Sequence, residues 1–258
     1  MGVQLKPSDF VHLHNHTHHS LLDGLTKIPD LVNRVKDLGM TAVAVTDHGT
    51  MSSAIELYKV ANEAGIKPII GLEAYVATRS RHDRDPSKDK ARFHLTILAM
   101  NNQGYQNLME LSTIANLEGM YYKPRIDHEI LEKYNEGLII LSGCSSSEIG
   151  NSLRNDNYEE AKKIAIWYKS IFGDRYYLEM QNHEWDVQVK VNEYLQKLSK
   201  DLDIPLVISN DGHYLVFEDQ DAHEILLCVG TGAFLTDEKR MSLKDFDLHV
   251  TDLSLIHI

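Results

Sequence analysis

Residues 10–24, FVHLHNHTHHSLLDG, place five histidines within eight positions and end on a carboxylate; the histidines are His12, His14, His16, His18 and His19. His14 and His16 alternate along an extended segment, so their side chains leave the same face and present two imidazoles to one cation. No ordinary core or surface needs such a density of histidine. The alternative is a solvated polar loop, or a His-rich tract that binds metal fortuitously. If His14 and His16 bind a cation, the rest of the chain is expected to supply further ligands to it.

The composition limits the partners of a 258-residue chain. The balance of 26 Lys+Arg against 38 Asp+Glu gives a net charge of -12, which argues against a broad basic surface for nucleic acid. Phosphate binding would have to be local, and three divalent cations would add about six positive charges at one spot. Cys144 and Cys228 are too few for a disulfide framework and indicate a reducing compartment. Because no apolar run approaches roughly 18 residues, we expect a soluble, cytoplasmic protein without a membrane segment.

The apolar pattern predicts alternating strands and helices. Seven strand candidates cover residues 10–16, 41–49, 67–75, 93–100, 136–142, 175–180 and 204–211. Helical periodicity appears over residues 28–38, 54–64, 103–117, 161–172, 187–202 and 219–229. The mixed-charge stretch 79–92 is expected to be an exposed insertion, and 121–127 a loop. Most strands are followed by a helix, which predicts a parallel sheet with right-handed crossovers and favours an α/β barrel over a doubly wound sheet.

Most of the reactive side chains lie at or just beyond the C-terminal ends of these strands. They are His14, His16, His48, Glu73, Cys144, Asp211 and His213. In a parallel barrel those ends converge on one face, where such folds place their active sites. The mixture of imidazole, carboxylate and one thiol suits zinc, with manganese or iron as rivals.

Each residue also has a simpler interpretation. Cys144 taken alone is a small buried residue, and His94 in its apolar strand is a core histidine with a satisfied ring. Glu73 is harder to dismiss, because a carboxylate inside PIIGLEAY is costly to bury without a cation or ion-pair partner. Asp47, beside His48, is a helix cap or an acceptor for a ligand, and we assign it no ligand role.

Eight motifs in a fixed order carry a family resemblance: HLHNHTHHS, LLDG, TDHG, IIGLEAYVA, HLTILAMNNQGYQNL, LSGCSSSEIG, YYLEMQNH and SNDGHYL. Over residues 8–240 the chain resembles the polymerase-and-histidinol-phosphatase (PHP) domain at the N-terminus of bacterial replicative DNA polymerase III alpha subunits. The resemblance implies a distorted seven-stranded, TIM-like (β/α)7 barrel. It implies a PHP domain over residues 1–235, followed by a C-terminal segment, 236–258, that is the truncated start of the region leading to the polymerase domains.

The resemblance further implies three divalent metal ions. The first would be held by His14, His16, Glu73 and Asp211. Glu73 would bridge to a second metal, bound by His94 and Cys144. The third would be held by Asp23, His48 and His213. All nine positions bear metal-competent side chains. His18 and His19 stand where such polymerases often have an acid and an aromatic residue, and His19 could compete locally for metal. The expected non-ligands are His12, His82, His128, His183, His223, His249 and His257.

The implied activity is metal-dependent hydrolysis of a phosphodiester. Two metals at about 4 Å would activate water for attack on phosphorus, and the third would steady an oxygen of the phosphate. His14, His16, Glu73, His94 and Asp211 would act in catalysis through these metals. The resemblance narrows the substrate to the 3' end of a DNA strand, hence a 3'-5' proofreading exonuclease in DNA replication.

Partners follow from the same resemblance. They are DNA and the other subunits of the polymerase III holoenzyme, reached through a parent DNA-directed DNA polymerase. Lys123 and Arg125, with Arg79 or Arg81, are candidates for gripping the DNA backbone. Two alternatives stay open: a non-catalytic scaffold module braced by its metals, and a free-standing phosphoesterase of the histidinol-phosphatase type.

Overall fold

The computed structural model describes residues 5–183 and 185–253, and its main feature is a strongly curled mixed sheet. Five strands form the central part, in the spatial order β2–β3–β6–β7–β8, with bounds Lys67–Ala77, Arg92–Ala99, Leu138–Leu141, Tyr176–Gln181 and Leu206–Ser209. β1 (Ala42–Val45) pairs with the first part of β2. A short hairpin, β4 (Met120–Tyr121) and β5 (Lys123–Ile126), pairs with the last part of β2, where the sequence predicted only a loop.

The N-terminal histidine segment closes this sheet into a barrel. On one side, the amides of Ala44 and Thr46 donate hydrogen bonds to the segment at 2.9 Å each. On the other side Gly212, just beyond β8, accepts from the amide of His16 at 2.7 Å and donates to the carbonyl of His14 at 3.1 Å. The segment with β1, β2, β3, β6, β7 and β8 gives a ring of seven members. The predicted distorted, TIM-like α/β barrel is therefore confirmed, although the first member forms isolated bridges and not a regular strand.

One strand runs against the predicted direction. β3 is antiparallel to both of its neighbours, β2 and β6, whereas the other pairs around the ring are parallel. The expectation of a wholly parallel sheet is wrong here because residues 78–91 contain no helix. Without a crossover helix, the chain returns as a long hairpin. As a result, the start of β3 lies at the same end of the barrel as the C-terminal ends of the parallel strands.

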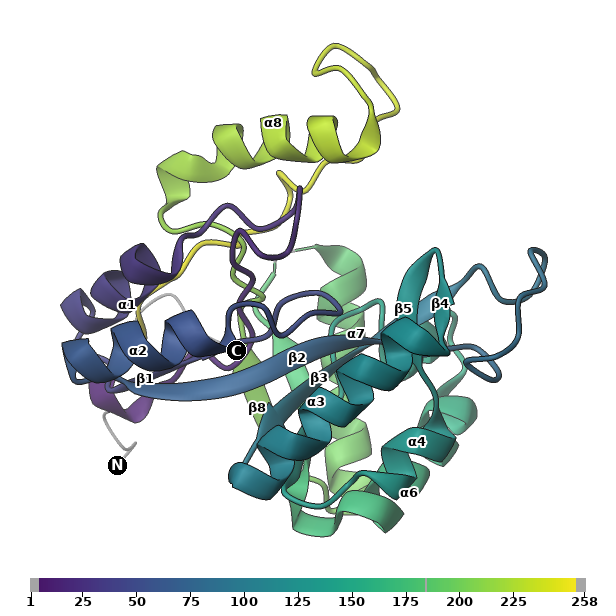
Figure 1. Cartoon of the computed structure of the whole chain (residues 1–258). Helices are drawn as coiled ribbons and strands as arrows, with labels where there is room; N and C mark the ends of the chain where they lie inside the picture. The colour runs from purple at the N-terminus through teal and green to yellow at the C-terminus, as the bar shows by residue number, and fades with distance from the viewer. Residues whose placement is uncertain (1–4, 184, 254–258) are drawn as a thin grey trace.

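Most of the helices pack around this ring. Their bounds are α1 Ile28–Asp37, α2 Ala54–Ala64, α3 Asn102–Leu117, α4 His128–Lys133, α5 Glu148–Arg154, α6 Tyr158–Phe172, α7 Asp186–Leu202 and α8 Gln220–Thr231, with short 3-10 turns at Pro7–Asp9, Gly173–Arg175 and Phe217–Asp219. The six helices predicted from periodicity are present; the sequence missed α4 and α5, of 6 and 7 residues, which hold too little of the pattern. Figure 1 shows α1 beside α2 at one end of the sheet and α8 apart from it. No helix among the described residues has the length and apolar character needed to cross a membrane.

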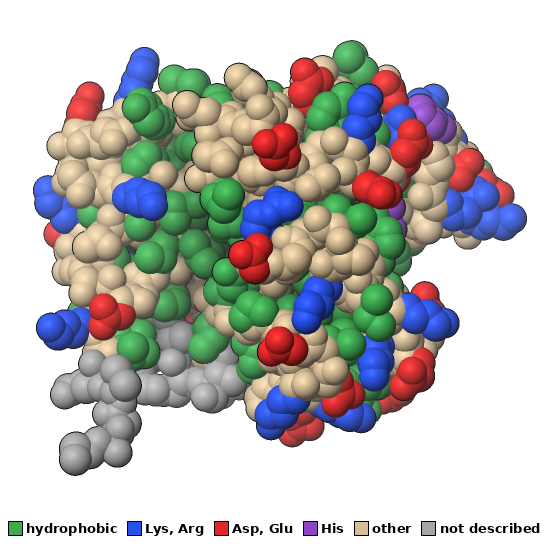
Figure 2. Space-filling model, turned by 90° about the horizontal axis from the view of Figure 1, so that it is seen from below, with side chains coloured by type: hydrophobic (Ala, Val, Ile, Leu, Met, Phe, Trp, Pro, Cys, Tyr) green, Lys and Arg blue, Asp and Glu red, His purple; other side chains and the backbone are tan. Residues whose placement is uncertain are grey.

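The two ends of the barrel differ in chemistry. The end opposite the histidines holds a cavity of about 780 Å³, lined by the start of β2, the end of β3 and apolar side chains such as Leu13, Leu141 and Val207. Figure 2 views the molecule from below, where hydrophobic side chains gather around a hollow. The histidines His14, His16, His48 and His213 are concentrated at the other end of the barrel.

The C-terminal segment contacts the barrel within the described residues. The amide of His213 donates to the carbonyl of Leu248 at 2.8 Å, and the amide of Val250 donates to the carbonyl of Tyr214 at 3.1 Å. Leu248 and Val250 are buried. The division at residue 235 stays a prediction, and His257 lies outside the described residues.

Arg125 ties the insertion between β2 and β3 to the β4–β5 hairpin. Its side chain is 0% exposed, although the sequence suggested a DNA contact. The guanidinium donates to four backbone carbonyls: Gly119 at 3.1 Å, Asp89 at 3.2 Å, Arg81 at 2.9 Å and Asp83 at 2.8 Å. The insertion is therefore anchored through a buried cation and is not simply a solvated loop.

Replacing Arg125 with methionine should lower the free energy of unfolding by about 3 kcal/mol, because four carbonyls lose a charged donor. Urea denaturation followed by circular dichroism measures this difference. Arg84→Met is the matched control, since the exposed Arg84 makes one long bond to Glu118 O at 3.4 Å, and it should change stability by less than about 0.5 kcal/mol. Equal stability of Arg125→Met and the native chain would contradict the anchoring role.

Candidate metal centre

The nine predicted ligands come from every member of the ring except β7, and they meet at one end of the barrel. They are supplied by the N-terminal segment and its loop (His14, His16, Asp23), the residues after β1 (His48), β2 (Glu73), the start of β3 (His94), the loop after β6 (Cys144) and the segment after β8 (Asp211, His213). Because β3 is reversed, His94 reaches this end from near the beginning of its strand. Glu73 lies within the second half of β2.

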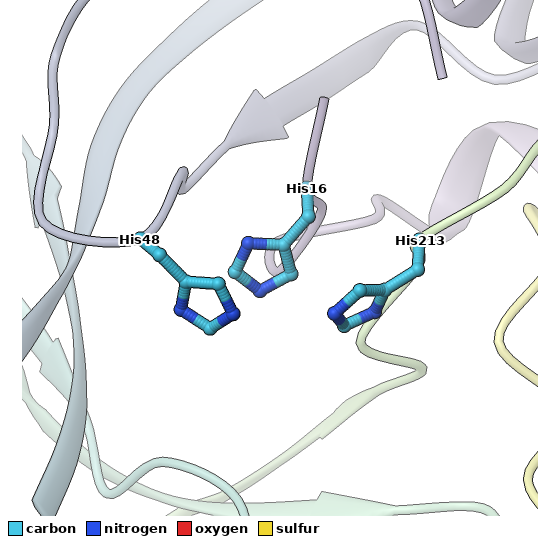
Figure 3. Close-up of side chains that lie close together, drawn as sticks. All are labelled: His16, His48 and His213. Atoms are coloured by element: carbon cyan, nitrogen blue, oxygen red, sulfur yellow. The ribbon is translucent and has the colours of Figure 1, made fainter. Parts of the chain in front are cut away.

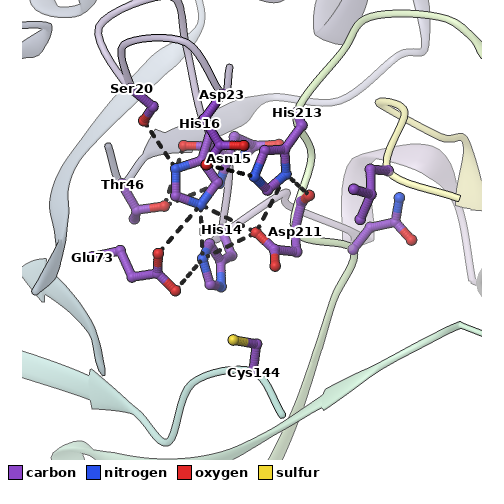
Figure 4. A network of polar contacts seen from close by, with 12 residues as sticks. His14, Asn15, His16, Ser20, Asp23, Thr46, Glu73, Cys144, Asp211 and His213 are labelled. Carbon is purple, nitrogen blue, oxygen red and sulfur yellow. Dashed lines mark hydrogen bonds and ion pairs between the residues drawn. The ribbon is translucent and has the colours of Figure 1, made fainter. Parts of the chain in front are cut away.

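The first predicted set is the most compact (Figure 4). The Nε2 atoms of His14 and His16 lie 3.2 Å apart, and Asp211 Oδ1 lies 3.3 Å and 3.1 Å from them. The carboxylate of Glu73 lies 3.3 Å from His14 Nε2 and 3.6 Å from His16 Nε2. Two ligands of one tetrahedral ion with bonds of 2.0–2.1 Å lie roughly 3.4 Å apart. The four side chains therefore have the mutual spacing of ligands around a common point.

Unsatisfied polar atoms test whether this cluster fits a cation. Glu73 Oε2, Asp211 Oδ1 and His48 Nδ1 are all buried, and although other predicted ligands lie close to them, none makes a hydrogen bond of normal geometry. Buried polar atoms without partners are rare because their lost hydration costs free energy. A divalent cation among them would restore those interactions, so the donors present fit a metal.

The second predicted set extends the cluster toward β6. His94 Nδ1 lies 3.1 Å from Glu73 Oε1, and Cys144 Sγ lies 3.7 Å from His94 Nδ1. The amide of Ser146 donates to the same sulfur at 3.4 Å. The side chain of His94 is 24% exposed, whereas Glu73 is 1% exposed. This side of the cluster is therefore open to solvent.

The third predicted set shares neighbours with the first. Asp23 Oδ2 lies 2.8 Å from His48 Nε2 and 3.7 Å from His213 Nε2. The other nitrogen of His48, Nδ1, lies 2.5 Å from Glu73 Oε2. Figure 3 shows His16, His48 and His213 turned toward one another, and one nitrogen of each lies within 4.8 Å of the other two. The structure thus brings all nine side chains into one connected cluster, while their roles as ligands stay predictions.

The pKa values show how strongly these groups depend on one another. Burial alone would lower the pKa of His14, but the charge of Asp211 and two further carboxylates outweighs it and holds that pKa well above its ordinary value. Burial also opposes charge on His48, yet Glu73 and Asp23 raise its pKa to about 10. Without a cation, both imidazoles would carry protons at neutral pH, and a metal would have to displace them.

Glu179 is the main residue that the sequence analysis missed. Its Oε1 lies 2.7 Å from Nδ1 of His14, which fixes that ring and leaves Nε2 facing the cluster. Thr96 Oγ1 and the amide of Gly143 each donate to Oε2 at 3.1 Å, and Ser209 Oγ donates to Oε1 at 2.5 Å. The signal was available, because a carboxylate within the strand YYLEMQ raises the same burial cost as Glu73.

Asp47 is hydrogen-bonded to the loop that follows His16. It is 0% exposed and accepts hydrogen bonds from the amide of Thr17 at 2.7 Å and the hydroxyl of Ser20 at 2.8 Å. Ser20 Oγ in turn lies 3.1 Å from Nδ1 of His16 and accepts from the amide of His48 at 3.1 Å. Asp47 therefore orients His16 and His48 through Ser20.

The predicted non-ligand histidines within the described residues have other surroundings. His12 Nε2 lies 2.8 Å from Thr251 O, His223 Nε2 lies 2.9 Å from Asp23 O, and His128 Nε2 lies 3.0 Å from Glu148. His249 pairs with Asp247, and the ring of His183 packs edge-on against Phe246. His82 lies on the exposed surface of the insertion.

The four basic candidates for DNA binding have three kinds of surroundings. Arg125 has no exposed surface, so the expectation that it grips DNA is wrong. Arg81 is 7% exposed and pairs with Asp127 at 3.0 Å, and Arg79 pairs with Asp89 at 2.6 Å. Of these four candidates, Lys123 is exposed, and its Nζ lies 5.6 Å from the ring centre of Tyr75, close to the cluster.

Relatives of known name match most of the chain. DNA polymerase III subunit alpha of Borreliella burgdorferi is 45% identical over 94% of this chain and 21% of that relative. The Thermus aquaticus protein of the same name is 47% identical over 93% of this chain and 20% of that relative. The chain therefore spans about a fifth of the length of these relatives.

A solved structure and a family model agree with the barrel. An amidohydrolase from Chromobacterium violaceum, with bound sulfate and no metal, superposes with a TM-score of 0.52 at 13% identity, covering 79% of this chain and 87% of that one. At that identity the likeness concerns the fold alone. The PHP domain family model matches residues 12–183, which are 172 of the 258 residues. The chain therefore belongs to the PHP domain family.

Proposed function

We propose that this chain is the phosphoesterase module of a bacterial replicative DNA polymerase III alpha subunit, where it removes nucleotides from the 3' end of DNA as a proofreading exonuclease. The observation that carries the proposal is the convergence of nine metal-competent side chains at the open end of the barrel. The names of the relatives supply the replicative context.

Three divalent cations, zinc foremost with manganese or iron as rivals, would occupy the three sets described above. Such cations lower the pKa of water toward neutrality and neutralise the charge of the phosphodiester under attack. The protein supplies orientation: Glu179 holds the ring of His14 at 2.7 Å, and Ser20 holds that of His16 at 3.1 Å. Pre-oriented ligands keep the geometry fixed during the reaction.

The open side of the cluster is where DNA would enter. His94, with a 24% exposed side chain, and Asp23, at 26%, border it. Tyr75 lies next to His94, and its ring is flanked by Lys123 Nζ at 5.6 Å and the guanidinium carbon of Arg92 at 5.5 Å. The Nε of Arg92 is buried without a partner. We assign Lys123 and Arg92 to the phosphate that neighbours the one being cleaved.

The proposed partners are the DNA primer strand and, through the parent polypeptide, the other subunits of the holoenzyme in the bacterial cytoplasm. Nucleotidyl transfer would belong to the parent polymerase and not to these residues. The bacterial relatives named DNA polymerase III subunit alpha support this context.

The purified chain should release nucleotides from 5'-labelled single-stranded and 3'-mismatched DNA, and a chelator should abolish the release. Asp211→Asn should reduce the rate by more than about 100-fold, because loss of a ligand exceeds the usual cost of losing its supporting contact. Asp37→Asn, an exposed carboxylate on α1, is the matched control and should leave the rate unchanged. Product analysis on a denaturing gel measures both.

Two other results would redirect the assignment. Stoichiometric metal without any nucleotide release would favour a scaffold in which the cations brace the barrel. Turnover of a small phosphomonoester together with indifference to DNA would favour a free-standing phosphatase of the histidinol-phosphate type.

Metal binding should release protons and strengthen as the pH rises. His14 has a pKa well above its ordinary value and His48 has a pKa of about 10, so both are protonated at pH 7 and must lose a proton to bind. The apparent affinity should rise about tenfold per pH unit for each proton displaced. Calorimetry in buffers of different ionisation enthalpy counts these protons, and an affinity independent of pH between 6 and 8 would contradict the assignment.

Lys123→Ala and Arg92→Ala should each weaken the binding of oligonucleotides while leaving the hydrolysis of a small aryl phosphodiester unchanged. Loss of one phosphate contact should reduce the slope of log affinity against log salt concentration by about 1. Lys36→Ala, at an exposed position of α1, is the control for the change in net charge. An unchanged slope in both variants would rule out a phosphate contact by Lys123 and Arg92.

A further inference from the structure

Two histidines of the crowded N-terminal segment take no part in the central cluster. His18 and His19 lie in the loop that follows His16, where His18 is exposed and the side chain of His19 is 26% exposed. Across from them lies Glu56, in the first turn of α2, with a 42% exposed side chain. None of these three is among the nine predicted ligands.

Their donor atoms converge. The ring centres of His18 and His19 lie 4.3 Å apart, and one donor atom from each of the three residues lies within 4.8 Å of the other two. His19 Nε2 is buried, has no hydrogen-bond partner, and lies 3.6 Å from Glu56 Oε2. That separation is too long for a hydrogen bond. It equals the 3.6 Å between His16 Nε2 and Glu73 Oε2 in the central cluster.

We propose that His18, His19 and Glu56 form a fourth metal site, separate from the central cluster. Two imidazoles and one carboxylate suit zinc or a similar transition metal, whereas magnesium and calcium prefer shells of oxygen alone. Three protein ligands leave at least one position for water. Because the site is partly exposed and has fewer protein ligands, it binds more weakly and exchanges faster than the centre.

A metal at this site would restrain the loop formed by residues 17–24. Residues 17–24 carry Ser20 and Asp23, and Asp47 already holds the start of this loop through Thr17 and Ser20. A metal bound by His18, His19 and Glu56 ties the same loop to α2. The site therefore steadies the segment that presents Asp23 to the centre, and it does not depend on the proposed phosphoesterase activity.

Metal content at a fixed free zinc concentration tests the proposal. The native chain and its variants are dialysed to equilibrium against buffered zinc, and bound metal is measured by mass spectrometry. His18→Gln/His19→Gln and Glu56→Gln should each lose one equivalent. His82→Gln is the control and should lose none. His82 has a 56% exposed side chain and lies 3.8 Å from Glu118, and it belongs to no metal-competent cluster among the described residues. Equal zinc content in all four proteins would overturn the site.

Cobalt spectra provide a second measurement. In Cys144→Ser, cobalt at the outer site should contribute d–d absorption without thiolate charge transfer. Adding His18→Gln/His19→Gln should lower the intensity of these bands by one cobalt equivalent, while the central sets that lack Cys144 keep theirs. If the central cluster bound no metal at all, the native chain would still carry one equivalent more than the double variant, so the two proposals fail separately. Bands of unchanged intensity in the combined variant would count against the outer site. Circular dichroism confirms folding, and the single variant His18→Gln replaces the double one if that is unstable.

Discussion

The contacts of one buried carboxylate connect the whole site. Glu73 is 1% exposed, and its oxygens lie 3.3 Å from His14, 3.6 Å from His16, 2.5 Å from His48 and 3.1 Å from His94. A carboxylate in such a place is stable only with positive charge beside it. Surrounding imidazolium groups lower the pKa of Glu73 well below its ordinary value, although burial opposes this. Protons or cations must therefore always accompany Glu73.

The barrel exists in its observed form because the N-terminal segment lies between β1 and the residues after β8. Its hydrogen bonds to Ala44, Thr46 and Gly212 fix the register of the segment that carries His14 and His16. A slip of one residue would turn both imidazoles to the opposite face. Closure of the fold and formation of the metal centre thus depend on the same backbone hydrogen bonds.

Two separate sets of hydrogen bonds position the side chains of the cluster. Glu179 joins His14 to β3, β6 and β8 through Thr96, Gly143 and Ser209. Asp47 and Ser20 hold the opposite side, next to His16 and His48. Each side of the cluster is thus held by its own buried carboxylate. His94 and Asp23, which are partly exposed, lie on the solvent-facing side. Those side chains are the ones that a substrate would meet.

The sequence by itself determined six of the helices, the barrel class and seven residues of the centre, because apolar periodicity and the chemistry of histidine, cysteine and carboxylate are local properties. Asp23 and His94 were assigned to the centre only through the family resemblance. The sequence also contained the burial argument for Glu179, which applies as much to YYLEMQ as to PIIGLEAY. Only the tertiary structure decided the direction of β3, since a hairpin and a crossover differ in their partners and not in their strand pattern. Likewise, only packing showed that Arg125 binds buried carbonyls while Lys123, two residues earlier, remains exposed. Strand spacing places both residues on the same face, and the insertion that covers Arg125 comes from a distant part of the sequence.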